Sequence, residues 1–231
     1  MLQKIITGGY RVLIRRKASK RRMNVIEANR EANKAFEEHA ADRFYKQRFV
    51  TDQSRLGDFK FGNSNAAHAG CEIIAVLNAC ELCRNMTDRD GSFDRAFGKD
   101  SDMLLLDKIR GDRILFSDMI YRAETGGYLL RFGKWGTNPM WLPEFASVYG
   151  IKLEKIKKEV PSEEGIYILS FWNDKRVKSG VHTACIQIIG DTAVAYNLNY
   201  TKQPETFDVP ALRKLFENMP LVAVYRVHPG K

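Results

Sequence analysis

The chain has 231 residues, of which 44% are hydrophobic, and it carries a formal net charge of +9. This length and composition exclude a disordered chain and allow one large domain, or one domain with an appendage, to bury a full core. No apolar stretch approaches the roughly 20 residues that span a bilayer, and the N-terminus lacks the apolar run of a signal peptide. We therefore expect a soluble protein located in the cytoplasm.

The first 23 residues are predicted to form a basic arm. Residues 1–22 contain eight lysines and arginines and no acidic residue, so they supply +8 of the net charge of +9. Apolar residues interleave with these charges, which suits an interfacial helix on an anionic membrane surface or a sequence-independent tether to nucleic acid. A solvated tail and an inhibitory pro-segment fit the same residues, and the sequence leaves these alternatives open.

Residues 24–50 are predicted to form a helix that packs on the following domain. Asn24 and Glu27 have the spacing of a capping box, so the helix is expected to begin at Asn24 and to run toward Phe49. Small and aromatic residues recur every four positions and predict one apolar face, made of Ala28, Ala32, Phe36, Ala40 and Phe44.

A loop rich in glycine, asparagine and serine, residues 57–65, leads to a second helix that begins near Cys71. Residues 73–80 are mostly apolar, so this helix should lie at the centre of a domain that spans residues 51–231. The N–H groups and the positive dipole end at the start of a helix favour a thiolate. Cys71 is therefore a candidate nucleophile.

The remainder of the chain predicts further helices and then a sheet. Residues 93–122 have a mixed, mainly helical pattern, and Asn138 with Pro139 is typical of a helix cap followed by a first-turn proline. Runs of β-branched and aromatic residues predict strands at 165–172, 181–189, 192–196 and 221–227, with one helix at 208–215. Helices first and an antiparallel sheet second indicate the α+β class.

The four cysteines are expected to be reduced. Cys71, Cys80 and Cys83 fall in one predicted helix, in which Cys80 and Cys83 are poorly placed to bond each other, and Cys185 falls in a strand. Reduced cysteines indicate an intracellular protein. A lone CxxC pair inside a helix is a weak zinc signal, so core packing is the better explanation, and no metal or cofactor is expected.

Four short segments follow the pattern of a known family. They are Gly-Cys-Glu-Ile-Ile-Ala at 70–75 with Asn65 before it, Gly-Thr-Asn-Pro at 136–139, Gly-Val-His-Thr at 180–183 and Val-Ala-Tyr-Asn at 194–197. In these segments the chain resembles the papain-like cysteine peptidases, specifically the compact bacterial branch related to bacteriocin-leader-processing peptidases. The resemblance covers roughly residues 57–227, and it implies a helical half and a sheet half that meet at a cleft.

The resemblance also implies a role for each matching residue. Cys71 matches the nucleophile, and His182 matches the base that forms a thiolate–imidazolium pair with it. Asn197 matches the residue that orients the imidazole, with Asn199 as its rival. Asn65 stands where the family usually has a glutamine, and its amide would stabilise the oxyanion together with the backbone N–H of Cys71.

Substrate contacts are expected at two places in the sequence. Trp135 and Gly136 lie in a glycine-rich loop, and Gly180 and Val181 directly precede His182. The residues as a set predict a cysteine peptidase that cleaves a peptide or protein substrate through an acyl-enzyme intermediate.

Other functions remain open at this point. An amidase or an acyltransferase would use the same catalytic residues. A papain-like module that binds peptides without catalysis is the alternative from another class, and a nucleic-acid-binding protein is a third.

Overall fold

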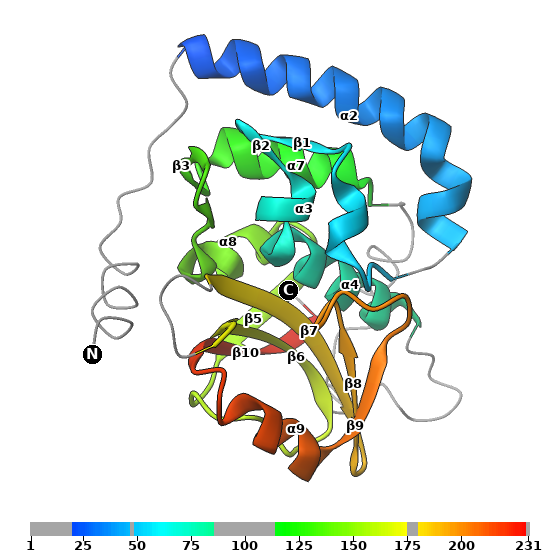
Figure 1. Ribbon diagram of the computed structural model, residues 1–231, viewed down its shortest axis with the longest axis vertical. Helices are drawn as coiled ribbons and strands as arrows, with labels where there is room; N and C mark the ends of the chain where they lie inside the picture. The colour runs from blue at the N-terminus through cyan, green and yellow to red at the C-terminus, as the bar shows by residue number, and fades with distance from the viewer. Residues whose placement is uncertain (1–19, 47–48, 86–113, 175–179, 230–231) are drawn as a thin grey trace.

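The computed structural model describes residues 20–46, 49–85, 114–174 and 180–229. Figure 1 shows most of the helices gathered at one end of the molecule and a twisted sheet, with one further helix, at the other. We call residues 20–150 the helical half and residues 151–229 the sheet half. This arrangement confirms the predicted α+β class. Residues 1–19, which make up most of the predicted basic arm, lie outside the described residues.

In the helical half, the long helix α2 (Lys20–Lys46) lies across the top of Figure 1 and covers the elements that follow it. The other described elements are η1 (Gln53–Leu56), β1 (Lys60–Phe61), β2 (Ser64–Asn65), α3 (Ala66–Ala69), α4 (Cys71–Asn85), α7 (Phe116–Gly126), β3 (Leu129–Gly133), β4 (Gly136–Thr137), η3 (Pro139–Trp141) and α8 (Leu142–Ser147). The predicted cap is confirmed, because Asn138 Oδ1 accepts a hydrogen bond from Met140 N at the start of η3. Most of the helix predicted at residues 93–122 lies outside the described residues.

In the sheet half, six described strands form one antiparallel sheet in the order β5-β10-β6-β7-β8-β9. They are β5 (Ile151–Lys155), β6 (Gly165–Trp172), β7 (Val181–Ile189), β8 (Thr192–Tyr196), β9 (Glu205–Asp208) and β10 (Leu221–Pro229), and α9 (Val209–Phe216) follows β9. The four predicted strands are confirmed. Strands β5 and β9 are not predicted from the sequence, because these edge strands are short and carry several charged residues in place of an apolar run.

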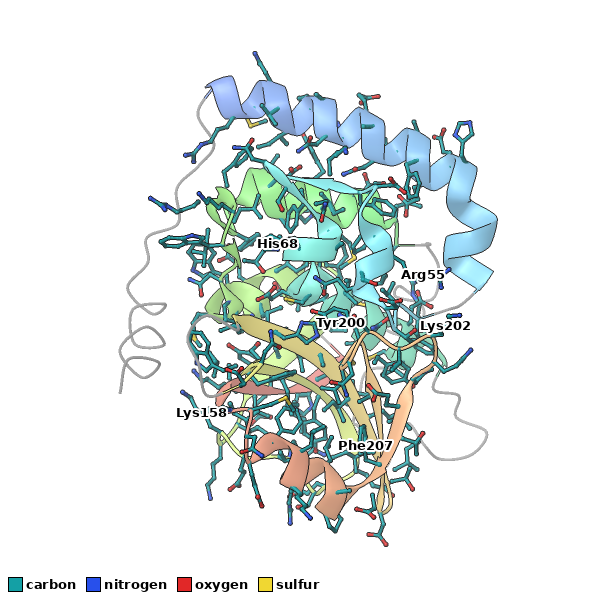
Figure 2. All side chains as sticks on the ribbon, in the orientation of Figure 1. Arg55, His68, Lys158, Tyr200, Lys202 and Phe207 are labelled. Atoms are coloured by element: carbon teal, nitrogen blue, oxygen red, sulfur yellow. The ribbon has the colours of Figure 1, made fainter. Side chains whose placement is uncertain are left out.

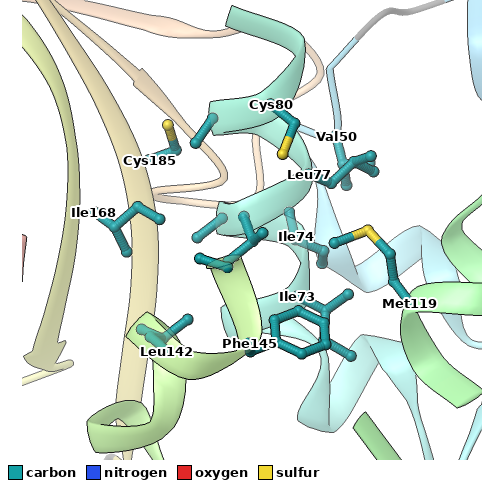
Figure 3. Packing of buried hydrophobic residues seen from close by; sticks show 14 of the residues in the cluster. Val50, Ile73, Ile74, Leu77, Cys80, Met119, Leu142, Phe145, Ile168 and Cys185 are labelled. Carbon is teal, nitrogen blue, oxygen red and sulfur yellow. The ribbon is translucent and has the colours of Figure 1, made fainter. Parts of the chain in front are cut away.

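Two apolar clusters cover the two faces of the sheet. The first lies between the sheet and α4 and joins Ile74 to Ile168 and Cys185 (Figure 3). The second lies between the sheet and α9 and includes Ala184 and Phe216. Because side chains alternate along a strand, Cys185 of β7 faces α4 and the preceding Ala184 faces α9. The buried helix α4 is thereby fixed against β7, which sets the position of its first residue.

The apolar face predicted for the first helix is confirmed only at Phe36, whose ring packs edge-to-face on Phe59 with 4.9 Å between ring centroids, and the side chains of Ala40 and Phe44 lie outside the described residues. Ala28 and Ala32 are exposed, and α2 begins at Lys20, four residues before the predicted cap Asn24. Among the side chains of α2 that the structure describes, the buried ones other than Ile26 are polar, namely Asn29, Asn33 and Glu37. They are buried because they satisfy backbone groups of the elements beneath the helix, which would otherwise lack hydrogen-bond partners.

The contacts of two of these residues illustrate the arrangement. Asn33 Nδ2 donates to Lys60 O at 2.8 Å, and Asn33 Oδ1 accepts from Lys60 N at 2.7 Å. The Glu37 carboxylate accepts from Phe116 N at 2.8 Å and from Ser117 N at 3.1 Å, so it caps the start of α7 from another helix. Polar contacts therefore set the position of α2.

All four cysteines are free, as the sequence predicts, and all four are buried. Among the helices of the described residues, none combines the length and the apolar character needed to cross a membrane.

Candidate active site

Cys71 is the first residue of α4, and only 7% of its surface is exposed. Its thiol donates a hydrogen bond to Glu72 Oε2 at 2.9 Å. Burial, followed by the charge of Glu72, raises the pKa of the Cys71 thiol well above its ordinary value, although a backbone hydrogen bond from Thr183 acts in the opposite direction. The predicted nucleophile is therefore held as a neutral thiol.

Glu72 is a residue of the site that is not singled out from the sequence. Its carboxylate is 5% exposed and lies close to the side chains of Thr137 and Thr183 as well as to the Cys71 thiol. Burial raises the pKa of Glu72, and the hydrogen bond from the Cys71 thiol, followed by the nearby hydroxyl groups of Thr137 and Thr183, opposes that rise. The signal available in the sequence is a carboxylate next to Cys71 at the start of an otherwise apolar helix, where burial of a charge needs specific partners.

His182 is the second residue of β7 and is 3% exposed. Its ring packs edge-to-face against Phe171 with 5.6 Å between ring centroids, and its Nε2 lies 2.6 Å from the backbone oxygen of Asn197. Because a carbonyl oxygen only accepts hydrogen bonds, Nε2 carries the proton and Nδ1 keeps a free lone pair. Burial lowers the pKa of His182, which favours this neutral form.

Asn197 contacts His182 through its backbone carbonyl, and its side chain binds elsewhere. Asn197 Oδ1 accepts from Gln53 N at 3.0 Å, and Asn197 Nδ2 donates to Gln53 Oε1 at 3.1 Å. The backbone of Asn197 has a φ of 59°, a left-handed conformation that asparagine adopts more readily than most residues. Its rival Asn199 donates to Glu205 Oε1 at 3.0 Å, so the structure brings Asn197, and not Asn199, to the imidazole.

Asn65 lies at the start of α3, six residues before the cysteine. Its Oδ1 accepts from the backbone N–H of His68 at 3.0 Å, which makes the side chain an N-cap. The NH2 group of the same amide is the group that can donate to an oxyanion. The oxyanion role of Asn65 stays a prediction.

The predicted substrate residues lie in two segments. Trp135 is 62% exposed in the hairpin between β3 and β4, where the guanidinium of Arg131 lies 4.4 Å from the centre of its ring. Gly136 begins β4 with a φ of 73°, and Gly180, with a φ of 74°, precedes Val181 at the start of β7. The substrate role of these four residues stays a prediction.

Two contacts bring the thiol and the imidazole into the same region. The backbone N–H of Thr183, the residue after His182, lies close enough to the Cys71 sulfur to lower the pKa of the thiol. The ring of Tyr200 lies 5.5 Å from that of His182, and burial and then the nearby Cys71 raise the pKa of Tyr200. Figure 2 shows Tyr200 where the helical half meets the sheet half.

The hydrogen bonds of the thiol and the imidazole nevertheless go to different partners. Among the described residues, Cys71 donates to Glu72, and the His182 ring bonds to Asn197. The structure therefore holds a neutral thiol and a neutral imidazole close together, without a thiolate–imidazolium pair.

Within the part of the chain that the structure describes, no three histidine, cysteine or carboxylate side chains gather to hold a metal ion. Comparisons of the chain with protein-family models, curated proteins and solved structures find no match. Function is therefore inferred from the side chains of the candidate site.

Proposed function

We propose that this chain is a cysteine peptidase with a papain-like fold that cleaves peptide bonds by means of Cys71 and His182. The observation that carries the proposal is the hydrogen bond of 2.6 Å between His182 Nε2 and the carbonyl of Asn197. This bond selects the tautomer in which Nδ1 is basic. The position of Cys71 at the start of α4, next to the strand that bears His182, supplies the matching nucleophile.

The chemistry begins from two neutral groups. Burial lowers the pKa of His182 and raises the pKa of Cys71, so at neutral pH the imidazole is free to accept a proton and the thiol still carries one. The thiol first turns away from Glu72. His182 Nδ1 then takes its proton while the sulfur attacks the substrate carbonyl, so that charge separates in the transition state and not in the free enzyme.

The later steps use the same groups. The backbone N–H of Cys71 and the NH2 group of Asn65 are the proposed donors to the oxyanion. His182 returns the proton to the leaving amine, which leaves a thioester on Cys71 that water hydrolyses. Each step uses groups of this chain and the substrate, together with one water.

Cleavage of a complex mixture of peptides, followed by mass spectrometry, tests the proposal on many candidate sequences at once. We expect cleavage by the wild type and none by Cys71→Ala. Cys80→Ala is the matched control, because Cys80 is a fully buried thiol in the middle of the same helix and should be dispensable for cleavage. Equal cleavage by wild type and Cys71→Ala, or no cleavage by either, would contradict the proposal.

A papain-like module that binds peptides without cleaving them is the second candidate. It is favoured by the low exposure of the Cys71 thiol and by its hydrogen bond to Glu72, both of which oppose a thiolate. Alkylation by iodoacetamide separates the two candidates. Modification of Cys71 that is much faster than that of the other three cysteines and is lost in His182→Ala supports the peptidase, whereas slow modification of all four cysteines at similar rates supports the module.

We also propose the cytoplasm as the compartment, and an anionic membrane surface or nucleic acid as the partner of residues 1–22. The four free, buried cysteines support a reducing compartment. The concentration of positive charge in residues 1–22 supports an anionic partner, and binding that falls steeply with salt would be its signature.

A further inference from the structure

Gln53 is a buried amide whose polar groups join three separate segments of the chain. It is 2% exposed and begins η1. Its backbone N–H and its Oε1 bind the side chain of Asn197, 144 residues away, at 3.0 and 3.1 Å. Its Nε2 donates to the backbone oxygen of Ala67 at 2.9 Å. Gln53 therefore connects a loop of the sheet half to α3 in the helical half.

The hydrogen bond to Ala67 connects Gln53 to the segment that ends at Cys71. Ala67 lies in α3, and the chain passes from α3 to Cys71 through Gly70. Gly70 N donates to Ala66 O at 2.9 Å, and a Cβ atom at Gly70 would lie 2.6 Å from that same oxygen. Because this turn admits no side chain, α3 and the start of α4 hold a close and fixed arrangement.

The hydrogen bonds to Asn197 connect Gln53 to His182. Asn197 is 1% exposed, and its backbone oxygen is the acceptor for His182 Nε2. With its amide held at both ends by Gln53, the left-handed backbone of Asn197 is fixed, and so is the direction of its carbonyl. Burial makes these bonds difficult to replace, because any unpaired polar group here would be cut off from water.

We propose that Gln53 is a positioning residue of the site, which holds the Asn197 carbonyl against His182 and ties it to the segment that ends at Cys71. This inference rests on the proposed peptidase for its catalytic consequence. The positioning itself is a property of the folded chain. The hydrogen bonds of Gln53 among the described residues go to Asn197 and Ala67, so it acts on the imidazole through Asn197.

NMR of the full chain, labelled with 15N in its histidines, tests the positioning independently of activity. The wild type should show His182 with its proton on Nε2. In Gln53→Ala the carbonyl is released, so we expect a mixture of the two ring tautomers. We also expect a further fall in the pKa of His182, because the bond to Asn197 opposes the effect of burial. An unchanged His182 signal would overturn the inference.

Two further variants make the test specific. Asn33→Ala removes another buried amide that makes paired bonds with a backbone, in α2, and should leave the His182 signal unchanged. Asn197→Gly keeps the left-handed backbone but removes the side chain that Gln53 holds, and should reproduce the Gln53→Ala spectrum even if Gln53→Ala does not fold. A wild-type spectrum in Asn197→Gly would contradict the inference.

Peptide cleavage supplies the catalytic readout. Misplacement of a catalytic group by about 1 Å costs roughly 100-fold in rate, so Gln53→Ala should lower kcat by about that factor with little change in KM. A rise in KM at unchanged kcat would contradict a positioning role. If the wild type cleaves nothing, the proposed function fails, whereas the tautomer of His182 still decides the role of Gln53.

Discussion

The two halves of the molecule bury different ionisable groups. Among the described residues, every buried carboxylate belongs to the helical half, and these carboxylates are Glu37, Glu72 and Glu124. The described part of the sheet half buries the imidazole of His182 and no carboxylate. The difference follows from the packing. The sheet is covered by apolar clusters on both faces, whereas α2 and α7 meet through polar side chains.

The candidate site takes its thiol from the helical half and its imidazole from the sheet half. Burial raises the pKa of Glu72, of Glu124 and of the Cys71 thiol, so the helical half tends to retain protons. Burial lowers the pKa of His182, so this imidazole tends to release its proton, whereas burial raises the pKa of the Cys185 thiol in the same half. The two halves thus bring a proton donor and a proton acceptor to a common boundary, which is the requirement for general-base activation of a thiol.

Removal of the acceptor is the change with the largest expected effect. His182→Ala should lower the rate of peptide cleavage by about 10² to 10⁴-fold, the usual contribution of a general base. His228→Ala is the matched control, because His228 on β10 pairs with Glu154 on β5 and its loss should not affect the rate. A His182→Ala protein with wild-type kinetics would mean that the sheet half supplies no base.

Glu124 provides a test of proton retention in the helical half. It is 2% exposed, accepts from Gly62 N at 2.6 Å and from Asn29 Nδ2 at 2.8 Å, and has a pKa that burial raises from 4.5 to about 7. Because the folded state binds this proton more tightly than the unfolded state, its contribution to stability is full below pH 4.5 and is lost as the pH rises through about 7. The loss amounts to about 3 kcal/mol.

Glu124→Gln cannot lose that proton. Urea unfolding of wild type and variant between pH 4 and 8 should therefore show their difference in unfolding free energy changing by about 3 kcal/mol in favour of the variant as the pH rises. Parallel pH profiles for the two proteins would show that Glu124 does not retain a proton.

Glu37 tests whether polar contacts set the position of α2. Glu37→Gln leaves one acceptor oxygen for the N–H groups at the start of α7 and places an NH2 group against donors, so the unfolding free energy should fall by about 2 kcal/mol. Glu38→Gln, an exposed change at the next position, should have almost no effect. Equal stabilities for the two variants would contradict the assigned cap.

Glu72 is expected to give the smallest effect. Glu72→Gln removes a charge beside the thiol, so the pKa of Cys71 should fall and iodoacetamide should modify it at lower pH than in the wild type. The pKa of Cys71 should remain above its ordinary value, because burial is the larger cause of its rise. Glu81 lies on the same helix but pairs with Arg84, so Glu81→Gln should not change the pH dependence of the modification of Cys71. A shift of the curve to higher pH in Glu72→Gln would contradict the assignment.

The sequence predicts elements well where burial depends on apolar side chains. The strands at 165–172, 181–189 and 192–196 have the predicted bounds, because each consists largely of β-branched, aromatic or small apolar residues. The central helix α4 also begins as predicted. Apolar side chains lie on almost every side of this helix, so the sequence indicates that other elements surround it.

The sequence predicts poorly where burial depends on polar partners. Asn29 bonds to Glu124, 95 residues away, and Gln53 bonds to Asn197, 144 residues away, so no local pattern marks these side chains as buried. Glu72 is missed for a related reason, because its partners on β4 and β7 come together only in the folded chain. Cys71, His182 and Asn197 could be singled out because their order and spacing resemble those of the proposed family. That order could not predict that Asn197 contacts His182 through its backbone oxygen and not through its side chain.

Acylation by p-nitrophenyl acetate, a probe small enough for a nearly buried thiol, tests the central claim most directly. The release of p-nitrophenolate reports the rate, and mass spectrometry of the digested protein locates the acetyl group. We predict a burst with one acetyl group on Cys71 in the wild type, and loss of the burst in His182→Ala. Acetylation spread over several residues, or an equal burst in the two proteins, would contradict a Cys71 nucleophile activated by His182.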